Sequence, residues 1–137
     1  MVAVAVTSRD PEFTELTRSL VIRIAIASVW IYFGLICKVL GLAPSHFRIV
    51  ERILNTNYAE QITVLIGAME VVMAFWVLSG YSRRLNAAVQ VTLVLAMNVI
   101  ETVLAVDLLL FGRFNLLISI LFASLVLVWG FRKPATS

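Results

Sequence analysis

The sequence predicts an all-α integral membrane protein, a four-helix bundle with a short amphipathic helix between its first and second spans. Of the 137 residues, 61% are apolar and 14% are charged, and the mean hydropathy is +1.00. Soluble domains contain about 45–50% apolar and about 25% charged residues. The apolar residues also gather into runs long enough to cross about 30 Å of hydrocarbon as helices. These observations exclude a disordered tail, a secreted disulfide scaffold and an ordinary cytosolic enzyme.

Four apolar runs define the expected spans. They are Leu20–Leu42, Ile62–Gly80, Leu85–Val106 and Phe114–Phe131. Continuous apolar sequence without period-two alternation favours helices over barrel strands. We therefore divide the chain into a polar N-terminal segment (1–17), a four-helix transmembrane domain (18–131) and a basic C-terminal tail (132–137). The N-terminal segment does not resemble a signal peptide, so the first span is expected to act as an uncleaved anchor.

The connection between the first two spans is expected to be a helix over Pro44–Leu54. Apolar side chains recur there at helical spacing on one face, and charged side chains fall on the other: Phe47, Val50, Ile53 and Leu54 against Arg48, Glu51 and Arg52. Such a helix lies in the outer interface or covers the mouth of the bundle. A segment that only fills the gap between two spans remains an equal alternative.

The distribution of basic residues predicts the orientation. With the N-terminus inside, the cytoplasmic side carries Arg9, Arg18, Arg83, Arg84, Arg132 and Lys133, and the outer side carries Arg48, Arg52 and Arg113. The larger basic group favours the cytoplasm, so both termini are expected inside, in a bacterial inner membrane. Trp30 is too deep for the interface and is expected in the core, whereas Trp129 fits the inner aromatic belt.

Charge and residue counts exclude several functions. The net charge of +3 and the pI near 9.5 come from basic residues scattered at span ends, without the stripe that nucleic-acid binding requires. Cys37 and His46 are the single residues of their kinds, so one chain forms no internal disulfide, and we expect no zinc or bis-histidine haem site. No nucleophile–base pair or phosphate loop is recognisable, and we predict no self-contained catalytic site.

The candidate functional residues are polar side chains inside the apolar runs. A charge at mid-membrane costs from about 2.5 to more than 10 kcal/mol, so these groups are expected to face the bundle interior and pair. The main set is Lys38, Glu70, Asn98, Glu101 and Asn115, with Tyr32 and Gly34; Arg23, Gln90 and His46 form a secondary set.

Helical rise predicts an outward-opening polar pocket. Lys38, Glu101 and Asn115 fall roughly 9–12 Å outward of the bilayer centre, and Glu70 lies near the centre within reach of the lysine. Gly34 shares a helix face with Lys38, so it is expected to leave space beneath the ammonium group. The helix over 44–54 would form the roof.

Two interpretations of this cluster remain open. In the first, Lys38 forms buried ion pairs with Glu101 and Glu70 that fix the register of the helices. In the second, the same residues bind a polar headgroup, such as a quinone carbonyl or a lipid head, or relay protons. A buried carboxylate such as Glu70 suits proton exchange with a quinol.

Several short motifs resemble the DoxX-like family of small membrane proteins. An aromatic run is followed by Gly34-Leu35, a two-residue gap and Lys38; Gly67 precedes Glu70 in the second span; and a basic turn follows Ser79-Gly80. Phe114-Asn115 is similar to a Pro-Phe-Asn-Pro element of the family but lacks both prolines. The resemblance covers about residues 18–131.

The resemblance implies a compact four-helix membrane bundle. Named members of the family are small subunits associated with quinone-linked sulfur or terminal oxidase complexes. Three hypotheses follow: an accessory or quinone-contacting subunit of a membrane oxidoreductase system, a bundle that binds or transports a lipid or small amphiphile, and a purely structural membrane partner. No cofactor motif is recognisable, a quinone or a lipid is the expected ligand, and the oligomeric state is left open.

Overall fold

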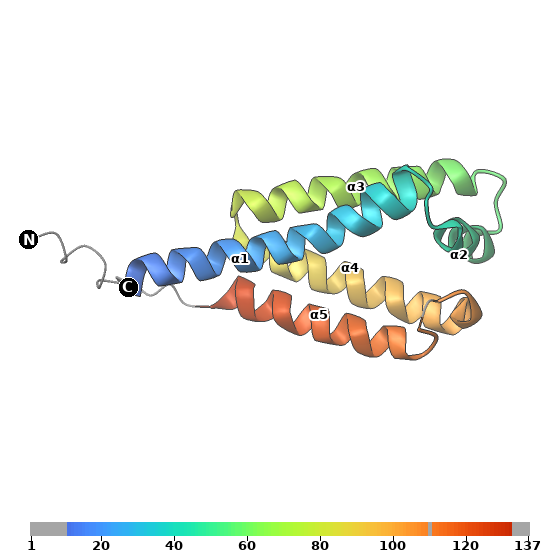
Figure 1. Ribbon diagram of the computed structural model, residues 1–137. Helices are drawn as coiled ribbons and strands as arrows, with labels where there is room; N and C mark the ends of the chain where they lie inside the picture. The colour runs from blue at the N-terminus through green and yellow to red at the C-terminus, as the bar shows by residue number, and fades with distance from the viewer. Residues whose placement is uncertain (1–10, 110, 133–137) are drawn as a thin grey trace, which may run out of the picture.

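The computed structural model describes residues 11–109 and 111–132, which form helices and connecting turns without any strand. The elements are α1 (Pro11–Ile31), α2 (Pro44–Leu54), α3 (Ala59–Ser79), α4 (Arg83–Leu104) and α5 (Phe114–Phe131), as Figure 1 shows. A π-helix over Tyr32–Val39 continues α1, and a short 3-10 helix over Val106–Leu108 follows α4. Within this described part, four segments are long and apolar enough to cross a membrane: Phe13–Val39, Ala59–Ser79, Arg83–Leu104 and Phe114–Phe131. The predicted four-span helical fold is confirmed.

The first helix begins earlier in the chain than the expected span. It starts at Pro11 rather than near Leu20. Proline is compatible with the first turn of a helix, where its missing N–H costs nothing. Residues 11–17 of the expected polar segment are therefore helical. Residues 1–10 and 133–137, which include most of that segment and of the basic tail, lie outside the described residues.

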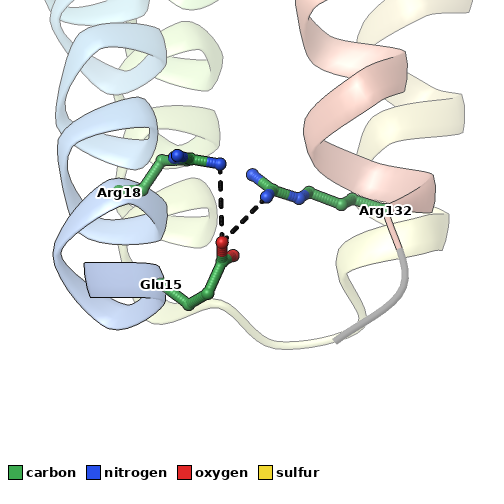
Figure 2. Close-up of polar contacts among 3 residues, drawn as sticks. All are labelled: Glu15, Arg18 and Arg132. Carbon is green, nitrogen blue, oxygen red and sulfur yellow. Dashed lines mark hydrogen bonds and ion pairs between the residues drawn. The ribbon is translucent and has the colours of Figure 1, made fainter. Parts of the chain in front are cut away.

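The two described ends of the chain meet at one end of the bundle. Figure 2 shows the Glu15 carboxylate between two arginines, with Oε1 lying 3.4 Å from Arg18 and 3.0 Å from Arg132. This contact joins the start of α1 to the end of α5. The two ends lie on the same side of the bundle because the number of spans between them is even. The opposite end carries α2 and the turn around Val106–Leu108 (Figure 1).

The bundle consists of two closely packed helix pairs. α1 and its π-helical continuation pack on α3, and α4 packs on α5. Close packing in the second pair depends on Gly130, where an added Cβ atom would lie 2.2 Å from the Cβ of Ala87. Large apolar side chains fill the space between the pairs, namely Ile26, Trp30, Met73, Val77, Val126 and Trp129.

Trp30 and Trp129 are both in this core. Trp30 is buried as predicted, but the interfacial position predicted for Trp129 is wrong, because this residue is also buried. The close contact of Gly130 with α4 draws the end of α5 inward, and Trp129 therefore packs between the helix pairs. Large apolar side chains on the outside, such as Phe75, Leu121 and Val128, present the surface that lipid would cover.

The first helix pair crosses at two glycines that face each other. A Cβ atom at Gly67 would lie 2.6 Å from the carbonyl oxygen of Gly34 and 2.7 Å from the Cβ of Lys38. A Cβ atom at Gly34 would lie 2.7 Å from the Gly67 oxygen. Small residues let helix backbones approach closely in membranes, where van der Waals packing replaces the hydrophobic effect as the driving force. The backbone of α3 therefore occupies the space beside Gly34, and the prediction of open space beneath the lysine is wrong.

Gly67→Ala should destabilise the protein by about 1–3 kcal/mol, because the added methyl group overpacks the crossing. Alanine has a higher helix propensity than glycine, so propensity alone would make the variant more stable. A net loss of stability therefore reports the overpacked crossing. The control is Ala68→Leu, on the exposed side of the same helix. The measurement is reversible unfolding in mixed micelles, followed by circular dichroism. Equal stability of Gly67→Ala and the wild type would contradict the close crossing.

Candidate functional site

A buried ion pair lies next to the glycine crossing. The Nζ atom of Lys38, in the π-helix, donates hydrogen bonds to both carboxylate oxygens of Glu70, in α3, at 2.9 Å each. The two side chains are 6% and 8% exposed. Of the two acids expected to approach Lys38, the structure therefore places Glu70 against it. The pair is closed to solvent here, and the expected opening above it stays a prediction.

Local sequence determines this geometry. Gly34 lies four residues before Lys38 and Gly67 lies three residues before Glu70, so each glycine shares a helix face with its charged neighbour. The close approach of the two backbones brings these faces together. The wider turn of the π-helix, in which Leu40 N donates to Leu35 O at 2.8 Å, carries Lys38 toward α3.

A second acid lies near the pair but does not join it. The part-buried carboxylate of Glu101, in α4, interacts electrostatically with the charges of Lys38 and Glu70. Within residues 11–109 and 111–132 it has no hydrogen bond or ion pair, so the expected direct contact with Lys38 is not made. The cluster thus contains one cation and two acids, and Glu101 is not needed to neutralise Lys38.

One aromatic ring lies near the lysine, and two further rings pack against it. The ring centroid of Phe33 lies 5.8 Å from Lys38 Nζ. Phe33 also packs edge-to-face with Tyr32 at 5.2 Å and with His46 at 5.8 Å. Tyr32 and Phe33 are 52% and 40% exposed, so they face the surrounding lipid. We call Tyr32, Phe33 and His46 the aromatic border.

The amphipathic helix α2 covers this end of the bundle, with the predicted bounds Pro44–Leu54. It buries Ile49 and Val50, whereas Phe47 and Leu54 of the predicted apolar face are exposed. Lipid can cover these two side chains, because an interfacial helix shares its apolar face between protein and membrane. Arg52 forms an ion pair with Asp107 and thereby connects α2 to the turn after α4.

His46 joins α2 to the cluster. Burial lowers the pKa of His46 from 6.5 to about 4, with a smaller contribution from the Lys38 charge. The imidazole is therefore neutral at pH 7. Because its pKa is lowered in the packed state, the packing of α2 loses stability as the pH falls from about 6.5 toward about 4.

The match to a family model covers residues 27–129 and includes every residue of this cluster. The chain belongs to the DoxX-like family. No curated protein and no solved structure matches the chain. The resemblance seen in the sequence is thus confirmed.

The predicted asparagines form a separate contact. Asn115 Nδ2, in α5, donates to Asn98 Oδ1, in α4, at 2.7 Å, and Asn98 Nδ2 donates to Val94 O at 2.8 Å. Among the described residues, no hydrogen bond connects these amides to Lys38 or Glu70. They join α4 to α5, whereas the ion pair joins the π-helix to α3.

Gln90 belongs to a third polar group, which sequence reasoning missed. Trp30 Nε1 donates to Gln90 Oε1 at 2.6 Å, Gln90 Nε2 donates to Asn86 Oδ1, and Asn86 Nδ2 lies 3.6 Å from Met73 Sδ. All four side chains are buried, and they connect the two helix pairs through the core. Spacing offered one signal: Asn86 and Gln90 are four residues apart and so share a helix face.

Arg23 lies far from the cluster and donates a hydrogen bond to the backbone at the end of α3. Its Nη1 atom donates to Leu78 O at 3.2 Å, beside Gly80, where a Cβ atom would lie 2.8 Å from the same nitrogen. A cation at a helix C-terminus stabilises the exposed carbonyl groups there. The residues predicted for the pocket therefore fall into separate contacts, the Lys38–Glu70 ion pair and the Asn98–Asn115 amides.

The cluster can offer hydrogen bonds to a polar headgroup. Lys38 supplies an ammonium donor, Glu70 and Glu101 supply carboxylates, and His46 supplies an imidazole. In residues 11–109 and 111–132, no group of three or more histidine, cysteine or acidic side chains could hold a metal ion.

Lys38→Ala should destabilise the protein by roughly 3–5 kcal/mol, because it leaves the Glu70 carboxylate buried without its partner. Glu70→Ala should have a similar effect. The double variant should lose less stability than the sum of the two single losses, since it leaves no buried charge without a partner. Unfolding in mixed micelles gives the three values. Additive losses would contradict the ion pair.

Proposed function

We propose that Lys38, Glu70, Glu101 and the aromatic border bind the headgroup of a quinone. On this proposal, the DoxX-like protein is an accessory, quinone-contacting subunit of a membrane oxidoreductase system. The bound quinone would carry electrons between the partner subunit and the membrane. Named members of the family are subunits associated with quinone-linked oxidoreductase complexes, and this association supports an oxidoreductase system as the partner.

The second acid is the observation that supports a binding site most directly. Lys38 and Glu70 already satisfy each other with hydrogen bonds of 2.9 Å. A bundle that needed only a structural ion pair would gain nothing from another carboxylate nearby, and a part-buried acid is costly in a membrane. Glu101 is therefore explained best as an acceptor for a ligand proton or hydrogen bond.

The aromatic border supports a flat ligand. Tyr32 and Phe33 lie on the lipid-facing side of Lys38, so an aromatic headgroup arriving from the membrane would meet them before the ammonium group. Offset and edge-to-face packing of aromatic rings is worth about 0.5–1.5 kcal/mol per pair beyond area burial. A quinone carbonyl could then accept a hydrogen bond from Lys38.

The orientation follows the basic residues. Arg18, Arg83, Arg84 and Arg132 lie at the helix ends opposite α2. If that end faces the cytoplasm, as the positive-inside rule favours, both termini are cytoplasmic and the headgroup site lies in the outer half of the membrane.

A structural role is the second candidate, and the low exposure of the ion pair favours it. Side chains that are 6% and 8% exposed are closed to any ligand until α2 or the border moves. Buried polar contacts between membrane helices fix register without binding anything.

Native mass spectrometry of protein gently extracted from its own membrane tests the proposal. One quinone should remain per chain in the wild type and be lost in Glu101→Gln, whose unfolding should be unchanged because Glu101 is outside the ion pair. The control is Glu60→Gln, the same substitution at an exposed position. A wild-type chain without quinone, a phospholipid in its place, or equal retention by Glu101→Gln would each overturn the quinone site.

A further inference from the structure

The net charge of the protein is concentrated on the side of the spans where α1 begins and α5 ends. By sequence, the segments on that side, 1–19, 80–84 and 132–137, contain more basic than acidic residues: Arg9, Arg18, Arg83, Arg84, Arg132 and Lys133 against Asp10, Glu12 and Glu15. The segments on the α2 side, 41–62 and 105–113, are balanced: Arg48, Arg52 and Arg113 against Glu51, Glu60 and Asp107. The spans are balanced as well, with Arg23 and Lys38 against Glu70 and Glu101. The whole net charge of +3 therefore belongs to the first side, which we call the basic end.

Arginines from three helices meet around a single carboxylate at the basic end. Glu15 Oε1 accepts hydrogen bonds from Arg18 Nη1 at 3.4 Å and from Arg132 Nη2 at 3.0 Å, and Figure 2 shows the two guanidinium groups converging on this oxygen. Arg83, at the start of α4, donates to Arg132 O at 2.7 Å. We call Arg18, Arg83 and Arg132 the arginine cluster. One carboxylate neutralises only one of its three charges, so the cluster keeps an excess of positive charge.

The arginine cluster retains hydrogen-bond donors for a ligand. A guanidinium group has five N–H donors in a planar fork, which matches two oxygens of a carboxylate or a phosphate. Among the described residues, each arginine uses one nitrogen in these contacts. The side chains of Arg18 and Arg132 are 53% and 37% exposed, so a ligand can reach them. The cluster therefore fits an anion that presents at least two acceptor oxygens.

The surface next to the cluster is apolar, which favours a lipid over a soluble anion. Val21 lies one turn from Arg18 on α1, and Val128 lies one turn from Arg132 at the end of α5. Both valines are exposed. A phosphate joined to acyl chains would cover the arginines and these side chains together, whereas free phosphate would cover the arginines alone. Basic residues at the end of a membrane span attract anionic headgroups in this way.

We propose that the arginine cluster binds the phosphate of an anionic phospholipid. Glu15 competes with this phosphate for the guanidinium groups of Arg18 and Arg132, and so limits the affinity. A zwitterionic lipid fits less well, because its own cation opposes the excess positive charge of the basic end. The site is independent of the proposed quinone site, which lies toward the α2 side of the bundle.

The test measures lipid binding to the full-length protein in detergent micelles by native mass spectrometry. The two probes are dioleoylphosphatidylglycerol and dioleoylphosphatidylcholine, which share their acyl chains and differ in headgroup charge. Arg18→Gln should raise Kd for the phosphatidylglycerol about fivefold and leave Kd for the phosphatidylcholine unchanged, since each basic residue near a membrane surface contributes about this factor. The control is Arg48→Gln, an exposed arginine of α2, which should change neither value.

Glu15→Gln gives a change of the opposite sign. It keeps the size of the side chain and removes the competing charge, so it should lower Kd for the phosphatidylglycerol about fivefold. A carboxylate that only joined α1 to α5 would give no such gain. Unfolding of each variant in mixed micelles shows that the fold is retained, as expected for Arg18→Gln because exposed ion pairs contribute little stability.

The outcomes decide for or against the lipid site. Tighter binding of phosphatidylglycerol that is weakened by Arg18→Gln and strengthened by Glu15→Gln supports it. Equal affinity of the wild type for the two lipids, equal losses in Arg18→Gln and Arg48→Gln, or no gain in Glu15→Gln would each overturn it. Displacement of the phosphatidylglycerol by an equal concentration of inorganic phosphate would also overturn it, because the cluster would then bind a soluble anion.

Discussion

The close approach of Gly34 and Gly67 is the constraint on which the rest of the structure depends. A lysine inside an apolar span is tolerated only with a partner, and the partner is in reach because the two helix backbones meet. The crossing fixes the first helix pair and places the π-helical turn against α3. It also leaves Tyr32 and Phe33 on the lipid side, so one packing contact positions both the ion pair and the aromatic border.

The second helix pair depends on different contacts, and this division explains the separation of the polar groups. Gly130 lets α5 approach α4, and the Asn98–Asn115 amides join the same helices. Between the pairs, the Trp30–Gln90 hydrogen bond crosses a core of large apolar side chains. Each polar group thus specifies one interface, as buried polar groups do in bundles, and Glu101 is the acid that these interfaces do not explain.

Sequence reasoning was sufficient for the spans and for the burial of the charges, because both follow from the cost of polar groups in hydrocarbon. It could not choose between Glu70 and Glu101 as partner of Lys38, since that choice depends on helix rotation and crossing. The burial of Asn86 was not predicted, because a polar residue two positions after a basic turn is typical of the membrane–water interface. The single pocket was predicted from depth alone, and depth places Asn115 beside Lys38 without determining which helix it faces.

The most direct test of the account is the distance between Lys38 and Glu70 in a bilayer. The sequence contains two lysines, Lys38 and Lys133, so a Lys133→Arg background leaves one labelled ammonium nitrogen. Solid-state NMR then measures its dipolar coupling to labelled glutamate carboxyl carbons. The account predicts a strong coupling, because Nζ lies 2.9 Å from both carboxylate oxygens of Glu70. In the Glu70→Gln variant, with only the glutamates labelled, this coupling should disappear. No coupling, or a coupling that persists in Glu70→Gln and is lost in Glu101→Gln, would contradict it.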